Sequence, residues 1–341
     1  MRNLAVLLAG VLTLAAPSLA KPAGAAEAGP LRLDWPLDCQ PGTTCWIVNL
    51  MDHDNGPGFK DYRCGTKGSD GNKGTGIAVR DTELSGPGVK VLAAADGTVL
   101  GQRDGMDDVD VRKIGLEAVK GRRCGNGMRI DHGGGWITQY CHLRNGSVTV
   151  KKGDKVTRGQ PLGLVGLSGG TTFPNLHFQV EHDGHLVDPF VGLTRTEACR
   201  PGPAPLWADW PSDSLNYASA ALSNIGFATT WPKADAARTG LYDDSVLPGR
   251  APMLILWADI YWSRKGDQMT FTIQGPDGAP VLDYQRRLKK TSLGRHLLFA
   301  GKRKAGQAWP AGAYTGTVTL KRDKGPDGPE THTIISRIQI R

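Results

Sequence analysis

The sequence lacks several features that would assign it to common protein classes. None of its six cysteines stands in a CxxC pair, so a cysteine-based zinc site is not expected. Beyond the N-terminus no apolar run is long enough to span a membrane, which excludes an integral membrane segment in the exported chain. No strong internal repeat and no substantial helical pattern is present. These absences leave a globular, strand-rich chain.

The N-terminus reads as an export signal. Arg2 supplies positive charge, Leu4 to Ala16 form an apolar run, and Ser18-Leu19-Ala20 is a small-x-small cleavage site. The run is shorter than the roughly 20 residues that a membrane anchor needs. We therefore predict a signal peptide over 1–20, a flexible Ala/Gly/Pro-rich leader over 21–30, and a periplasmic or extracellular location.

The cysteines support the same compartment. An even number of cysteines in an exported chain predicts disulfides. Six cysteines allow 15 connectivities, so the sequence leaves the pairing open. Lipid attachment at the first cysteine is not expected, because it lies far from the cleavage site. The six residues are Cys39, Cys45, Cys64, Cys124, Cys141 and Cys199.

The formal net charge of +8 favours an anionic partner in the cell envelope, such as cell wall, anionic lipid or an acidic polymer. The positive residues form no clustered stripe, so solubility alone is an equally good explanation. Nucleic acid is not an expected partner for an exported protein.

The organisation along the chain predicts an all-β protein of two domains. A length of 341 residues fits two domains, and 46 glycines with 22 prolines favour many turns and short strands. Residues 31–199 alternate short strands with Gly-rich turns. A Pro- and Trp-containing stretch over 200–212 marks a linker. Residues 213–341 predict a β-sandwich of immunoglobulin-like type.

Particular strands can be predicted from local patterns. Val89 to Val99 reads as a strand, an Asp-Gly turn and a second strand, and Asn126 to Leu143 reads as a hairpin with three glycines at its turn. In the C-terminal part, apolar side chains alternate with threonines, as in a strand with one buried face. The alternating apolar residues are Met269, Phe271 and Ile273, followed later by Tyr314, Val318 and Leu320.

Several histidines occur in an order that suggests a metal site: His132, His142, His177, His182 and His185. Zinc hydrolases hold the metal with three side chains and leave one position open for water. Other groups then handle the proton and the oxyanion charge. His142 and His177 fall on separate predicted strands that can face one groove.

Five ordered motifs carry a resemblance to a known family. They are NKGTG (Asn72–Gly76), DGTV (Asp96–Val99), TQYCHL (Thr138–Leu143), GDKVTRG (Gly153–Gly159) and PNLHF (Pro174–Phe178). Over roughly residues 45–190 the chain resembles the lysostaphin/LytM family of zinc peptidases, which cut peptidoglycan cross-bridges. The resemblance implies a LytM-type antiparallel β domain.

Carried onto this sequence, the resemblance implies a degenerate site. The first zinc histidine falls on Asn72 and the zinc aspartate on Gly76, whereas the third ligand is retained as His177. Of the two catalytic histidines, one is retained as His142 and the other is replaced by Asn175. His132 and Tyr140 are expected to line or orient the groove, or, for His132, to pair with a neighbour.

The replacements remove the chemistry. Glycine has no side chain, and a neutral amide is a poor zinc ligand beside imidazole or carboxylate. Asn175 can donate a hydrogen bond to an oxyanion but cannot shuttle a proton. We therefore expect no zinc and no catalysis. In this family, inactive members resemble factors that activate cell-wall amidases, so the hypothesis is a non-catalytic protein that binds peptidoglycan or regulates such an amidase.

Two alternatives stay open. A zinc endopeptidase could rebuild its site from His177, His142 and a nearby group such as His53, Asp70 or His182. Zinc would be a cofactor only in that case. Alternatively, the C-terminal sandwich could be the working part and the LytM-type domain a scaffold.

Overall fold

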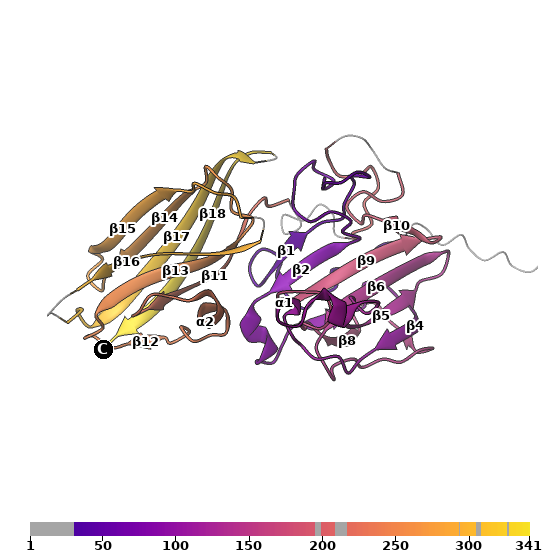
Figure 1. Cartoon of the computed structure of the whole chain (residues 1–341), viewed down its shortest axis with the longest axis horizontal. Helices are drawn as coiled ribbons and strands as arrows, with labels where there is room; N and C mark the ends of the chain where they lie inside the picture. The colour runs from indigo at the N-terminus through magenta and orange to yellow at the C-terminus, as the bar shows by residue number, and fades with distance from the viewer. Residues whose placement is uncertain (1–30, 195–198, 209–216, 293, 305–307, 326) are drawn as a thin grey trace, which may run out of the picture. The chain divides into compact units, whose positions relative to one another are not determined.

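The computed structural model describes residues 31–194, 199–208, 217–292, 294–304, 308–325 and 327–341. The predicted signal peptide and leader lie outside these residues, as does the end of the predicted linker. The division of the chain at 200–212 therefore stays a prediction. Two β regions with separate hydrophobic cores make up the described chain (Figure 1).

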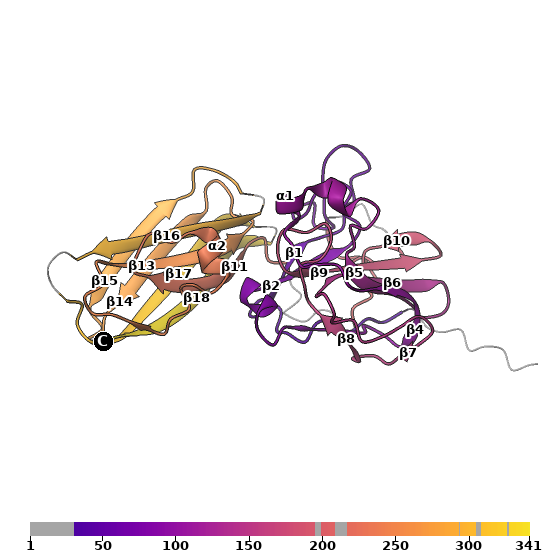
Figure 2. The same ribbon diagram turned by 60° about the horizontal axis from the view of Figure 1, so that its bottom comes forward.

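The first β region contains one large antiparallel sheet. Its strand order is β1-β2-β9-β6-β5-β4-β7, with β10 paired to β9. Figure 2 shows β9, β6 and β5 side by side in the middle of this sheet. Two further strands form a small separate sheet. The strands are β1 (Cys45–Asn49), β2 (Thr75–Val79), β3 (Lys90–Leu92), β4 (Gly97–Arg103), β5 (Asn126–Asp131), β6 (Trp136–Leu143), β7 (Lys155–Val156), β8 (Pro161–Leu164), β9 (Asn175–His182) and β10 (His185–Val187).

The predicted hairpin over Asn126 to Leu143 is confirmed as β5 and β6. Gly133, Gly134 and Gly135 at its turn all have positive φ, at 79°, 56° and 81°, which glycine adopts without steric cost. The two strands predicted over 89–99 are also present, as β3 and β4. They join different sheets, however, because β3 pairs with β8 and β4 pairs with β5.

The second β region is built from two sheets. One has three strands in the order β11-β13-β16, and the other has five in the order β12-β18-β17-β14-β15. Among the described strands of this region, β12 alone pairs in parallel, with β18. The strands are β11 (Ala221–Ala228), β12 (Val246–Leu247), β13 (Met253–Tyr261), β14 (Gln268–Gln274), β15 (Pro280–Arg287), β16 (Arg295–Arg303), β17 (Gly312–Gly325) and β18 (Gly328–Ile340).

One hydrophobic core lies between these two sheets. Leu254 and Leu256 of β13 belong to the same cluster as Phe271 of β14 and Val318 of β17. The alternating residues predicted for β14 and β17 are buried, and threonines occupy the opposite face, as the period of two requires. The predicted two-layer sandwich is thus confirmed, whereas its immunoglobulin-like type stays a prediction.

Helices contribute little to either region. They are η1 (Asp81–Leu84), α1 (Val111–Ile114), η2 (Leu116–Val119) and α2 (Ala234–Arg238). Within the described parts of the chain, no helix has the length and apolar character that a membrane crossing would require. The all-β class predicted from the sequence is confirmed.

All six cysteines form disulfides, as predicted. The pairs are Cys39–Cys45, Cys64–Cys199 and Cys124–Cys141. The second pair closes a loop of 135 residues, whereas the first closes a loop of only 6. A cross-link stabilises a fold chiefly by restricting the unfolded chain, and the effect grows with loop length.

Removing the two pairs should therefore have unequal effects. We expect Cys64→Ser with Cys199→Ser to cost about 5 kcal/mol of unfolding free energy, and Cys39→Ser with Cys45→Ser about 2 kcal/mol. Urea unfolding of the two double variants, followed by tryptophan fluorescence, measures the difference. Equal losses would contradict the loop-length explanation.

Candidate functional site

The candidate site lies on one face of the large sheet, where strand register aligns residues from five strands. His177 of β9 is paired with Gly76 of β2 on one side and with Cys141 of β6 on the other. The row continues through Gly127 of β5 to Arg103 of β4. Directly paired residues of neighbouring strands share a face. His177, expected to be the retained ligand, and Gly76, expected to replace the aspartate, are therefore cross-strand neighbours.

A β-bulge brings His142 beside His177. Asn126 and Gly127 of β5 pair with Leu143 and Cys141, so His142 is the extra residue on β6. It has φ 69°, a left-handed conformation that is uncommon for a residue with a side chain. A bulge changes the direction in which a side chain projects. The two imidazole rings consequently lie 6.2 Å apart, centre to centre.

Both histidines are held in the neutral form. The His142 Nδ1 donates to the carbonyl of Ser168 at 2.8 Å, which fixes the proton on Nδ1. Burial lowers the pKa of His142 to about 4. Burial and the neighbouring His142 lower the pKa of His177 to about 3, although a hydrogen bond to Gln179 opposes this shift. Near neutral pH the site thus carries two uncharged imidazoles.

Asn72 is occupied by its own loop. Its amide nitrogen donates to the carbonyl of Leu50 and, at 2.8 Å, to that of Gly74. Both amide hydrogens therefore serve to hold the loop. The retained Gly74 has a separate reason, because a Cβ there would lie 2.3 Å from the carbonyl oxygen of Phe178. The loop packs too closely on β9 to accept any side chain at this position.

The space beside Gly76 is filled by a residue that sequence reasoning missed. Asn49 of β1 is paired with Gly76, and a Cβ added to the glycine would lie 3.0 Å from the Asn49 Cβ and 3.2 Å from its Nδ2. A carboxylate cannot be placed here unless Asn49 moves. No local motif could reveal this, because the contact depends on sheet pairing between segments 27 residues apart in sequence.

Asn175 does not point its donors into the site. Its amide nitrogen donates to Thr171 Oγ1 and to the carbonyl of Phe173, both at 2.7 Å. The side chain is buried, at 4% exposure. Both hydrogens are used within the adjoining turn, so the oxyanion-donor role considered from the sequence is not available in this arrangement.

His132 and Tyr140 belong to the core side of the sheet and not to the face that carries His177. Tyr140 is fully buried in the hydrophobic core, and its hydroxyl accepts the backbone N–H of Ala94 at 2.8 Å. His132 bonds to the carbonyl of Asp96 at 2.6 Å and to Thr138 Oγ1 at 2.7 Å. The expectation that they line the groove thus fails for a periodic reason, since alternate residues of a strand face opposite sides. The alternative for His132, pairing with neighbours, describes what is seen.

Two of the groups considered for a relocated zinc site have other partners. His53 bonds Asp188 at 2.7 Å, and His182 lies 4.3 Å from the ring of Trp136. Among the described residues, no three His, Cys, Asp or Glu side chains are grouped so as to hold a metal ion. At the three family positions only one imidazole is present. These residues do not fit a tetrahedral zinc ion, which needs at least three protein donors.

A polar network continues from His177 along β9 and across to β5. Gln179 bonds His177 and donates to Glu181 at 2.7 Å, and Glu181 accepts from Arg129 at 2.5 Å. Sequence reasoning also missed this network. Its signal was the alternation in HFQVEH, where every second residue faces the same side as His177.

Comparisons with known proteins bear on the type of domain. The model of Peptidase family M23 matches residues 72–189. The chain therefore carries an M23-type peptidase domain, of the lysostaphin/LytM class, in its first β region.

Three relatives illustrate the range of proteins with this domain. "Cell division protein DipM" of Caulobacter vibrioides is 33% identical over 37% of this chain and 19% of its own length. "Peptidoglycan DD-endopeptidase ShyA" of Vibrio cholerae is 46% identical over 19% of this chain and 14% of its own. "Murein hydrolase activator EnvC" of Escherichia coli is 34% identical over 32% of this chain and 22% of its own. The chain thus spans less than a quarter of the length of these relatives.

Solved structures also align with part of the chain. The alignments cover 41–49% of it at 20–27% identity, with TM-scores of 0.26–0.32.

The two neutral histidines predict a specific pH dependence. Their pKa values in the folded protein lie below the unfolded value of about 6.5, so the unfolded chain binds protons first as pH falls. Stability should then be lost from about pH 6.5 downward, by about 1 kcal/mol for each histidine at pH 5.5.

Unfolding free energies at pH 7.5 and 5.5 test this dependence. A variant with His142→Gln and His177→Gln should lose about 2 kcal/mol less than the wild type over this interval. His185→Gln, at an exposed histidine of the same region, is the control. Parallel pH curves for the wild type and the double variant would contradict the prediction.

Proposed function

We propose that this protein is an exported, non-catalytic LytM-type protein that binds peptidoglycan or regulates a cell-wall amidase. The observation that carries the proposal is the state of the zinc positions. Asn72 donates both amide hydrogens to the backbone carbonyls of Leu50 and Gly74, and Asn49 fills the space beside Gly76. Two of the positions that the resemblance assigns to zinc ligands are therefore engaged with protein atoms, which supports the non-catalytic interpretation.

The remaining groups do not supply hydrolysis by themselves. In the family, zinc lowers the pKa of bound water so that a nucleophile exists near neutral pH. Here His142 and His177 are neutral, and the Nδ1 proton of His142 is committed to Ser168. The amide hydrogens of Asn175 bond to Thr171 and Phe173 of the adjoining turn, so neither is directed toward the histidines. The sheet face that carries His177 still offers hydrogen-bonding groups, which are suited to binding a ligand.

The names of the relatives support a cell-wall role, and they are compatible with either a regulator of wall hydrolases or an endopeptidase. EnvC is named a murein hydrolase activator and DipM a cell division protein, which favours an amidase or another wall hydrolase as partner. ShyA is named a peptidoglycan DD-endopeptidase, which keeps the enzymatic alternative in view. The three disulfides support export to an oxidising compartment, the periplasm or the cell exterior.

The decisive experiment measures wall binding, zinc content and cleavage on one preparation of the purified protein. We expect it to co-sediment with purified peptidoglycan sacculi or to raise the activity of an added amidase. It should contain far less than one zinc per chain and release no dye from labelled sacculi. Stoichiometric zinc together with cleavage that His177→Ala abolishes would establish the alternative, a zinc endopeptidase with relocated ligands.

Restoring the family ligands tests the assignment of the zinc positions. A variant with Asn72→His, Gly76→Asp and Asn175→His should bind zinc weakly, because the new carboxylate meets Asn49. Adding Asn49→Ala removes the overlap and should tighten zinc binding by about tenfold, since crowding of this kind costs on the order of 1–3 kcal/mol.

Competition with a fluorescent chelator measures the zinc affinities. Asn49→Ala alone is the matched control and should bind no zinc. If the triple and quadruple variants bind zinc equally well, Asn49 does not obstruct the aspartate position.

A further inference from the structure

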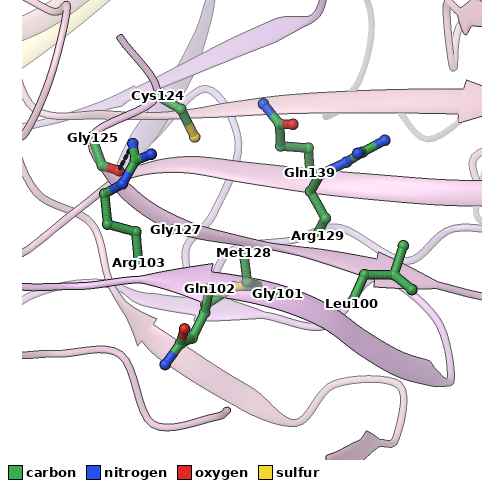
Figure 3. A pocket seen from close by; sticks show the side chains of 10 residues that line it. All are labelled: Leu100, Gly101, Gln102, Arg103, Cys124, Gly125, Gly127, Met128, Arg129 and Gln139. Atoms are coloured by element: carbon green, nitrogen blue, oxygen red, sulfur yellow. Dashed lines mark hydrogen bonds between the residues drawn. The ribbon is translucent and has the colours of Figure 1, made fainter. Parts of the chain in front are cut away.

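A pocket of about 360 Å³ lies at the β4 end of the residue row that contains His177. It is lined by β4, β5 and β6 together with the residues just before β5 (Figure 3). The lining includes Gly101, Gly125 and Gly127. Of these, Gly101 leaves open space, because a Cβ there would meet no atom within 4 Å.

The chemistry of the pocket is cationic and amidic. Its charged side chains are Arg103 and Arg129, and Gln102 and Gln139 add amide groups. None of the lining residues is an aspartate or a glutamate. A pocket with guanidinium and amide donors and no carboxylate is suited to an anionic, hydrogen-bond-accepting ligand.

The two arginines differ in how far they are already engaged. Arg129 is paired with Glu181 at 2.5 Å, which neutralises its charge and fixes its position. Arg103 makes one long bond of 3.4 Å to the carbonyl of Gly125 and no ion pair with any described residue. Figure 3 shows Arg103 on one side of the pocket and Arg129 with Gln139 on the other. Arg103 is thus the group left to bind a carboxylate.

The distance from the histidines sets the size of such a ligand. From His177 to Arg103 the row crosses three strand spacings of about 4.8 Å, or roughly 14 Å in all. An extended peptide rises about 3.3 Å per residue, so about four residues cover this span. A peptidoglycan stem is a short peptide of similar length that carries free carboxylates.

We propose that this pocket is a carboxylate subsite, in which Arg103 binds the carboxylate of a peptidoglycan stem peptide lying across the sheet face from His177. The inference rests on the proposed function, since it names the ligand of the same face. Arg103 offers two parallel N–H donors, which match the two oxygens of a carboxylate. The network from His177 to Arg129 then forms the floor beneath the peptide.

The test uses one defined probe in two forms. The first is the synthetic stem tetrapeptide L-Ala-γ-D-Glu-meso-diaminopimelate-D-Ala, and the second is the same peptide with its carboxylates amidated. Calorimetric titration of the full protein measures both affinities. We expect the acid form to bind at least about tenfold more tightly, because a charged hydrogen bond contributes more than a neutral one.

Two variants probe the pocket by independent means. Arg103→Gln should reduce affinity for the acid peptide by about tenfold and leave affinity for the amide unchanged. Gly101→Leu should weaken binding of both peptides, because a Cβ at this position meets no atom within 4 Å and the side chain can fill the hollow without strain. Arg250→Gln, which removes an exposed arginine of the second β region, is the matched charge control.

The outcomes separate this inference from the proposed function. If Arg103→Gln loses affinity equally for acid and amide, or for neither, while sacculus binding persists, the carboxylate subsite is wrong and the proposed function stands. If the protein ignores the stem peptide and binds an acidic segment of an amidase through Arg103, the inference is likewise overturned. Zinc-dependent cleavage of the tetrapeptide would instead overturn the proposed function.

Discussion

The pairing of β9 with β2 and β6 is the constraint on which the rest of the site depends. It sets His177 between Gly76 and Cys141, and it aligns the row that ends at Arg103. The register is held because the alternate residues of β9, Leu176, Phe178 and Val180, are buried on the opposite face of the sheet. A slip of one residue would exchange the two faces and expose that apolar set.

This constraint explains how an M23-type fold can be stable whichever residues occupy the positions that the resemblance assigns to zinc. The sheet derives its stability from core packing and strand pairing, and none of these contacts requires a zinc ion. Two of the positions that the resemblance assigns to zinc ligands have protein partners: Asn72 holds its loop, and Asn49 lies beside Gly76. Each of these residues satisfies a polar group or fills a space, so both contribute to the hydrogen bonding and packing of this face of the sheet.

The sequence predicted the class of the fold well because its signals are local. Alternation in β14 and β17 and the three glycines of the β5–β6 turn depend only on neighbours along the chain. The prediction that Tyr140 lines the groove was wrong. Tyr140 was placed there because it shares a motif with His142. The bulge at His142 turns that histidine out of the strand's alternation, whereas Tyr140 keeps to it and faces the core.

The sequence by itself determined which side chains are available: one imidazole at the three positions expected to hold zinc, an asparagine at an expected catalytic position, and six cysteines for disulfides. Only the tertiary structure decided what these side chains do. In the folded chain the amide nitrogen of Asn175 donates to Thr171 and Phe173 of the adjoining turn, and Asn49 lies beside Gly76. Arg103 and Arg129 line one pocket. The physical reason is that such contacts join strands distant in sequence, and the burial of a whole sheet face sets their register.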